Sequence, residues 1–146
     1  VEVDLASLLH EIVDPYRAGL DGRIRLDLAI PAALPPVYVD RNLMARSITN
    51  IIENALHAMP GAGTLRVTAT AQSGSVHISV SDTGVGMDDE ALARAFEPYF
   101  STKASGTGLG LPLAKRNVEL SGGTITVHSV RDQGTTVGIS LPALRQ

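Results

Sequence analysis

Hydrophobic and polar residues alternate along this chain with two periods, one typical of helices and one typical of strands. Apolar residues at helical spacing predict three helices, over residues 4–18, 40–58 and 109–120. Alternation with a period of two predicts strands over residues 24–30, 65–69, 76–80, 124–127 and 136–141, with a very short strand at 37–39. The turn at Ser73-Gly74 joins two of these strands into a hairpin.

This order of elements predicts one α/β (α+β) domain over residues 1–146, built as a two-layer sandwich. We expect a mixed, largely antiparallel sheet of about five strands, covered on one face by about three helices. Residues 88–107, between the predicted strand at 76–80 and the predicted helix at 109–120, follow neither period. We interpret this segment as a lid in which Phe96 and Phe100 act as anchors.

Composition narrows the class of protein. Hydrophobic residues make up 44% of the chain and aromatic ones only 3%, so the core is aliphatic. The net charge of −3 gives no support for nucleic-acid binding, and the lack of cysteine excludes disulfides and thiolate metal sites. No apolar run approaches the roughly 20 residues that span a bilayer, and no signal peptide is visible. Because the chain begins at Val1, we read it as a fragment of a longer protein.

The second helix carries an unusual polar stripe. Arg46, Asn50, Glu53, Asn54 and His57 lie on one face at helical spacing. Asn is a poor helix former, but its amide oxygen is a hard neutral ligand suited to Mg²⁺. The alternative is a solvated helix face that contains two Asn residues by chance.

Two glycine-rich loops follow. Asp82-Thr83-Gly84-Val85-Gly86-Met87 comes directly after a strand, where the Asp82 carboxylate can accept a hydrogen bond from adenine N6. Gly106-Thr107-Gly108-Leu109-Gly110-Leu111 opens a helix, a position that favours phosphate. Each loop alone is equally typical of an ordinary turn.

Two common nucleotide sites are excluded. The dinucleotide fingerprint belongs in the first βαβ unit, with an acidic residue about 20 positions on, whereas Gly106 lies late in the chain. The phosphate-binding loop needs a Gly-Lys-Ser/Thr sequence, which is missing.

Taken together, the motifs resemble those of the ATPase family that unites DNA gyrase, the Hsp90 chaperone, sensor histidine kinases and MutL. Asn50-Ile51-Ile52-Glu53-Asn54-Ala55 is similar to the N box, Asp82 to Met87 to the G1 box and Gly106 to Leu111 to the G2 box. Gly134-Thr135-Thr136 resembles the last glycine box. The resemblance implies the Bergerat-type ATP-binding fold, with ATP and Mg²⁺ as ligands.

The resemblance also implies roles for individual residues. Asn54 would ligate Mg²⁺, Asn50 would support the metal-phosphate site, and Asp82 would bind adenine N6. Gly84 and Gly86 would let the first loop pass close to the base, and Thr135 would help hold adenine through a water.

Further roles concern the phosphates and the base pocket. Lys103 lies where a cation of the lid would reach the phosphates. The residues of the second glycine-rich loop would also bind the nucleotide; they are Gly106, Thr107, Gly108, Leu109, Gly110 and Leu111. His57 stands where related kinases often have Lys, so its phosphate contact depends on pH. Ala58 replaces an aromatic residue common in relatives, and we expect Ile52 or Leu111 to line the pocket instead.

Within this family, Phe96-Glu97-Pro98-Tyr99-Phe100-Ser101-Thr102-Lys103 resembles the F box of sensor histidine kinases, closest to the nitrogen-regulation type. Gyrase and MutL relatives carry Glu at the position of Asn50, and Asn cannot act as a general base. The resemblance therefore implies transfer of the γ-phosphoryl group to a histidine on a separate dimerisation domain, absent from this chain. A response-regulator receiver domain would be the second partner. The catalytic domain would act in the cytoplasm, and it would make no direct contact with a membrane even if the parent protein is membrane-bound.

His10-Glu11-Ile12-Val13-Asp14-Pro15 resembles the H box that carries the phosphorylated histidine. An acceptor histidine must lie on a dimerising pair of long helices, and Gly19, Gly22 and Pro31 prevent a second long helix here. We therefore interpret His10 as a surface histidine of the first helix. A serine kinase of the anti-sigma-factor type and a nucleotide-gated clamp or chaperone ATPase are the alternative functions.

Overall fold

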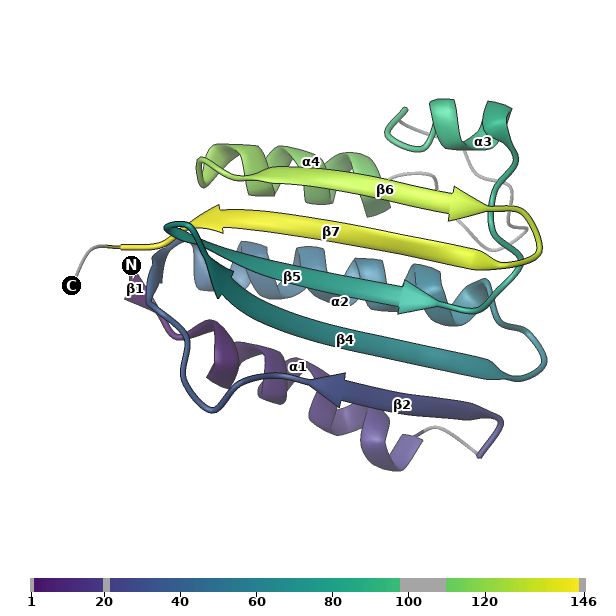
Figure 1. Cartoon of the computed structure of the whole chain (residues 1–146), viewed down its shortest axis with the longest axis horizontal. Helices are drawn as coiled ribbons and strands as arrows, with labels where there is room; N and C mark the ends of the chain where they lie inside the picture. The colour runs from purple at the N-terminus through teal and green to yellow at the C-terminus, as the bar shows by residue number, and fades with distance from the viewer. Residues whose placement is uncertain (1, 20–21, 98–109, 145–146) are drawn as a thin grey trace.

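In the part of the chain that the structure describes, five strands form the main sheet, and the helices packed on it cover one of its faces (Figure 1). The computed structural model describes residues 2–19, 22–97 and 110–144. The sheet has the order β2-β4-β5-β7-β6, and only the β2–β4 pair is parallel. Its strands are β2 (Ile24–Ala29), β4 (Gly63–Gln72), β5 (Ser75–Asp82), β6 (Thr124–Val130) and β7 (Gly134–Pro142). The predicted mixed sandwich is confirmed.

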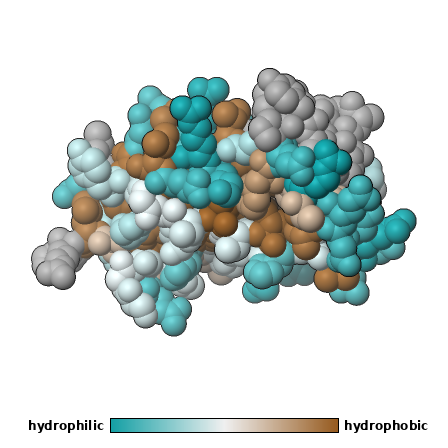
Figure 2. Space-filling model, turned by 90° about the horizontal axis from the view of Figure 1, so that it is seen from above, coloured by the Kyte–Doolittle hydropathy of each residue, from teal (hydrophilic) through white to brown (hydrophobic). Residues whose placement is uncertain are grey.

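Three helices make the second layer. They are α1 (Leu5–Gly19), α2 (Arg41–His57) and α4 (Gly110–Leu120). The first lies behind β2 and β4, the second crosses behind the centre of the sheet, and α4 lies beside the edge strand β6 (Figure 1). Viewed from above this edge, hydrophobic surface appears in several places between hydrophilic regions (Figure 2).

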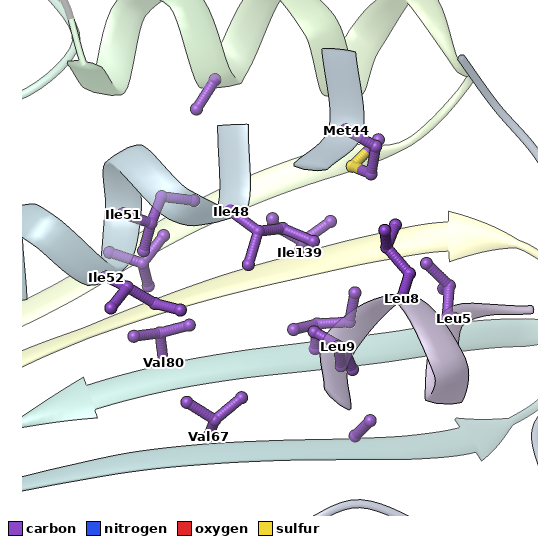
Figure 3. Packing of buried hydrophobic residues seen from close by; sticks show 14 of the residues in the cluster. Leu5, Leu8, Leu9, Met44, Ile48, Ile51, Ile52, Val67, Val80 and Ile139 are labelled. Atoms are coloured by element: carbon purple, nitrogen blue, oxygen red, sulfur yellow. The ribbon is translucent and has the colours of Figure 1, made fainter. Parts of the chain in front are cut away.

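The core fills the space between the two layers. Leu8, Ile48 and Ile52 from the helices point toward Val80 and Ile139 on the sheet (Figure 3). All five side chains are at least 98% buried. Because aliphatic side chains fill this layer, the helices are fixed on the sheet, and the ends of α2 and β5 and the start of β7 are held at one edge of the molecule (Figure 1).

The start of α2 follows directly from its sequence. Asp40 has an extended backbone, and its carboxylate accepts a hydrogen bond of 3.0 Å from the Leu43 N–H, which makes it the N-cap of the helix. Leu43 is 38% exposed, whereas Met44 is buried, because the apolar stripe runs through Met44, Ile48 and Ile51.

Two elements were not anticipated. β1 (Glu2–Val3) pairs with β3 (Val37–Tyr38), the expected very short strand at 37–39, in a small separate sheet, and the two residues of β1 are too few to show a readable period. The short helix α3 (Asp89–Ala93) lies inside the segment expected to be irregular. Asp88 caps it by accepting from the Ala91 N–H at 2.8 Å. None of the helices in the described part of the chain is long and apolar enough to cross a membrane.

Candidate functional site

A partly enclosed cavity lies where the ends of α2 and β5 meet the starts of β7 and α4. Most of its lining is apolar, and three polar side chains enter it, from Asn54, Asp82 and Thr135. The remaining described lining residues are Ile51, Ala55, Ala58, Val80, Val85, Gly86, Met87, Leu111 and Val137. An apolar slot with a few polar groups is typical of a site for a flat, partly polar ring such as a purine.

Asp82 is the last residue of β5 and is only 8% exposed. One of its carboxylate oxygens accepts a hydrogen bond of 2.9 Å from the Gly84 N–H. This bond orients the carboxylate at the end of the strand and fixes the first turn of the following loop.

The loop after Asp82 is held from both sides through the backbone of Val85. The Val85 N–H donates to the Ala58 carbonyl at the end of α2, at 2.9 Å. The Val85 carbonyl accepts from the Asp132 N–H in the turn between β6 and β7, at 2.6 Å. The loop is therefore clamped between a helix end and a strand turn, which gives the cavity one fixed wall.

The glycines of this loop are required by neighbouring protein backbone. A Cβ at Gly84 would overlap the Ala58 carbonyl, and one at Gly86 would overlap the Val130 carbonyl. Gly86 also has a φ of +67°, in the left-handed region that favours glycine. The expectation that these glycines let the loop approach a base stays a prediction. Gly86 lines the cavity, and Gly84 is not among its described lining residues.

Ser129 on β6 joins this loop to β7, a role that no sequence pattern indicated. Its hydroxyl oxygen accepts from the Met87 N–H at 2.7 Å. The same oxygen lies 3.1 Å from the Gly134 carbonyl oxygen and 2.8 Å from the Thr135 hydroxyl oxygen. Met87 is 42 positions away in sequence, so only the folded chain reveals the connection.

Only part of the polar stripe of α2 reaches the described lining of the cavity. Asn54 lines it, whereas Asn50 is half-buried and His57 is exposed, and neither belongs to its described lining. Leu111 lines the cavity, as expected. Ile52 does not, because it is fully buried in the core, and Ile51 takes the expected place on the cavity wall. One step along a helix turns a side chain by about 100°, which separates these two neighbours.

Glu53, next to Asn54, is held by the first helix. The Tyr16 hydroxyl donates a hydrogen bond of 2.5 Å to the Glu53 carboxylate. Burial raises the pKa of Tyr16 well above its ordinary value of 10.0, and the hydrogen bond to Glu53 and the negative charge of Glu53 raise it further. This contact fixes α1 against the helix that carries the Asn residues.

Replacing Tyr16 by Phe is expected to lower the free energy of unfolding at neutral pH by about 1 kcal/mol, because Glu53 loses its donor. The folded-state pKa of Tyr16 is raised, so this stabilisation is complete below pH 10.0 and is lost as the pH rises through the raised value. Urea unfolding of both proteins across this range should show their difference shrinking. The matched control is Tyr38→Phe, at a tyrosine that is 67% exposed, and it should show no such trend.

Several expected site residues lie outside the described residues. They are Lys103, Gly106, Thr107, Gly108 and Leu109, together with the lid anchor Phe100. Gly110 is the first residue of α4. The other lid anchor, Phe96, is half-buried against the core, and the Lys115 ammonium lies 5.9 Å from the centre of its ring.

His10 lies on α1, which packs its apolar side on the sheet. The element that follows α1 is the strand β2, so α1 is not the first half of a helical hairpin. This arrangement agrees with the interpretation of His10 as a histidine of a sheet-covering helix.

The described residues contain no cluster of three or more His, Cys, Asp or Glu side chains that would hold a metal ion alone. Asn54 nevertheless brings one amide group to the cavity. Mg²⁺ usually takes one or two protein oxygens and fills its other positions with waters and substrate phosphates. The donor set therefore fits Mg²⁺ bound together with a nucleotide and does not fit a preformed metal cage.

Comparison with known sequences finds one family of ATPases and, within it, histidine kinases. The profile of the family described as histidine kinase-, DNA gyrase B- and HSP90-like ATPases matches residues 39–145. Sporulation kinase E of Bacillus subtilis is 33% identical over 97% of this chain and 19% of its own length. The sensor histidine kinase ZraS of Escherichia coli is 36% identical over 96% of this chain and 30% of its own length. This chain thus spans less than a third of either relative.

Solved structures are also similar. The catalytic domain of the histidine kinase ThkA has a TM-score of 0.86 at 25% identity, with 98% of this chain and 95% of that chain covered. Full-length ShkA in complex with AMPPNP has a TM-score of 0.85 at 31% identity, with 100% of this chain and 31% of that chain covered.

Proposed function

Because this chain belongs to the family of histidine kinase-, DNA gyrase B- and HSP90-like ATPases, as a catalytic domain of the sensor histidine kinase kind, we propose that its cavity binds the adenine of Mg-ATP. The bound γ-phosphoryl group is then transferred to a histidine of a separate dimerisation and phosphoacceptor domain. A response-regulator receiver domain is the next acceptor, and the reaction takes place in the cytoplasm. Residues 1–146 act as one catalytic unit.

One observation carries this proposal. Side chains from four separate sequence motifs, Asn54, Asp82, Leu111 and Thr135, line a single cavity. In the base-binding part, Asp82 accepts a hydrogen bond from the adenine N6 amine, and the apolar walls cover the ring faces. The complex of similar ShkA with AMPPNP, an ATP analogue, supports a nucleotide as the ligand.

At the phosphate end, Asn54 holds Mg²⁺ through its amide oxygen, and Asn50 supports the site from the preceding turn of α2. When bound, Mg²⁺ neutralises charge on the phosphates. Lys103 and the loop from Gly106 to Leu109 are proposed to contact the phosphates as well. His57 is exposed at the end of α2 and is proposed to donate to the phosphates through a ring N–H.

Transfer needs little covalent help from this chain. A nitrogen of the acceptor imidazole attacks the γ-phosphorus, the bond to the bridging oxygen breaks, and ADP leaves with that oxygen. The chain contributes by positioning the nucleotide and shielding it from water. Asn50 has no basic oxygen with which to activate water, so hydrolysis is slow and the phosphoryl group is kept for the acceptor.

The proposal is tested by incubating the chain with ATP labelled at the γ-phosphate, alone and with a purified histidine acceptor domain of a similar kinase. We expect acid-labile label on the acceptor domain only, and about a tenfold slower transfer by Asn54→Ala, because the Mg²⁺-dependent part of binding is lost. Label on His10 would contradict the separate acceptor. Label on a serine of a small partner protein would indicate a serine kinase, and steady hydrolysis without an acceptor would indicate a clamp or chaperone ATPase.

A further inference from the structure

We propose that Ser129 is a positioning residue for the purine base and acts through the hydroxyl of Thr135. The Ser129 hydroxyl directs its proton to Thr135, so that Thr135 donates its own proton, directly or through one water, to the ring nitrogen beside the exocyclic amine. This inference rests on the proposed function, because it assumes that the cavity takes adenine.

The argument begins with a proton count at Ser129. A serine hydroxyl has one proton and two lone pairs. One lone pair accepts from the Met87 N–H at 2.7 Å. The proton goes either to the Gly134 carbonyl at 3.1 Å or to the Thr135 oxygen at 2.8 Å. If it goes to Gly134, Thr135 must donate to Ser129 and has only lone pairs left for a ligand. If it goes to Thr135, the proton of Thr135 is left for a ligand.

Adenine selects between these two states. Asp82 and Thr135 are directly paired residues of β5 and β7, and both side chains line the cavity. A base whose amine is bound by Asp82 therefore places an adjacent ring nitrogen near Thr135. Such a nitrogen carries only a lone pair, so it needs a donor. Binding of adenine thus favours the state in which the Ser129 proton turns from Gly134 to Thr135.

Ser129 also braces the loop through Met87, so a loss of affinity after its removal is not sufficient evidence. A brace alone would affect every nucleotide to the same degree. A residue that acts through one ring nitrogen affects only nucleotides that have that nitrogen. The analogues 1-deaza-ATP and 7-deaza-ATP each lack one of the two nitrogens that flank the amine, and they separate these roles.

The experiment measures calorimetric affinities of ATP and both analogues for the wild-type chain, Ser129→Ala, Thr135→Val and Thr135→Ser. The matched control is Ser81→Ala. Ser81 on β5 and Thr136 on β7 form another pair of hydroxyl groups, with their oxygens 2.9 Å apart. This pair lies one position along the strands from Asp82 and Thr135, so its side chains point to the opposite face of the sheet. Melting temperatures show whether each variant is folded.

We expect Ser129→Ala and Thr135→Val each to weaken ATP binding about 3- to 10-fold, the loss of one net hydrogen bond. One of the two deaza analogues should bind the wild type and these variants equally. Thr135→Ser keeps the hydroxyl and should bind ATP more tightly than Thr135→Val, whereas the control Ser81→Ala should keep the wild-type affinity for ATP. Equal losses for ATP and both analogues, or no loss for ATP, would overturn the role of Ser129. If Ser129→Ala does not fold, the Thr135→Val titration decides by the same criterion. A wild-type chain that binds no ATP would overturn the proposed function itself, and this inference with it.

Discussion

Replacing Asp82 by Asn is expected to weaken ATP binding about 5- to 150-fold, corresponding to the loss of about 1–3 kcal/mol at a buried polar contact. The change keeps the size of the side chain, removes its negative charge and replaces one acceptor oxygen by an NH₂ donor. Asp82 is 8% exposed, and one of its oxygens accepts from the Gly84 N–H. An Asn that keeps this bond places its NH₂ group where the second carboxylate oxygen lies. Two donors, the Asn amide and the adenine N6 amine, would then face each other.

The same change should invert the preference for the base. Inosine triphosphate has a carbonyl in place of the N6 amine, and this carbonyl is repelled by a carboxylate but can accept from the NH₂ group of Asn. We therefore expect the ratio of ATP affinity to inosine triphosphate affinity, measured by calorimetry, to fall in Asp82→Asn.

The matched control is Asp27→Asn, which removes the same charge from an aspartate on β2 that pairs with Arg66 at 3.5 Å. That variant should bind ATP as the wild type does. An unchanged affinity ratio in Asp82→Asn, in a variant with normal melting temperature, would contradict the assignment of Asp82 to the base.

Local features of the chain were predictable because their causes are local. The Asp40 cap of α2 depends on a bond to a residue three positions away, and the hairpin of β4 and β5 depends on the turn at Ser73-Gly74. Asp82 and Asn54 were also found, because a strand end and a helix stripe can be recognised from spacing. These features gave the fold class and the polar groups of the cavity.

Features made by distant segments were not predictable in the same way. Ser129 is one polar residue in a strand, and its contacts with Met87 and Thr135 exist only after β6 packs beside β7 and the loop. The isoleucine of α2 that lines the cavity could not be predicted either. Ile51 and Ile52 are chemically identical, and only packing decides which of them lies on the cavity wall. The glycines were singled out for a close approach to the base, which stays a prediction, and the described contacts at Gly84 are with the end of α2.

Gly134 illustrates how far such a packing requirement reaches. It opens β7, has a φ of +129°, and a Cβ there would overlap the carbonyl of Asp82. Alanine would therefore suffer both a strained backbone and a clash with backbone atoms, neither of which can be relieved by turning a side chain. We expect Gly134→Ala to lower the free energy of unfolding by about 2–5 kcal/mol, measured by urea denaturation.

Two other glycines separate these two costs. Gly74 has a φ of +79° with open space around it, so Gly74→Ala should cost only about 1 kcal/mol for the backbone. Gly61 has neither a positive φ nor a neighbour within 4 Å, so Gly61→Ala should be neutral or slightly stabilising. If Gly134→Ala costs no more than Gly74→Ala, the close approach to Asp82 is not a constraint. If it costs more, the extra loss measures the contact that holds the β7 start against the end of β5. Because this contact also sets Thr135 beside the Asp82 carboxylate, the folded fraction of Gly134→Ala should bind ATP more weakly, whereas Gly74→Ala should not.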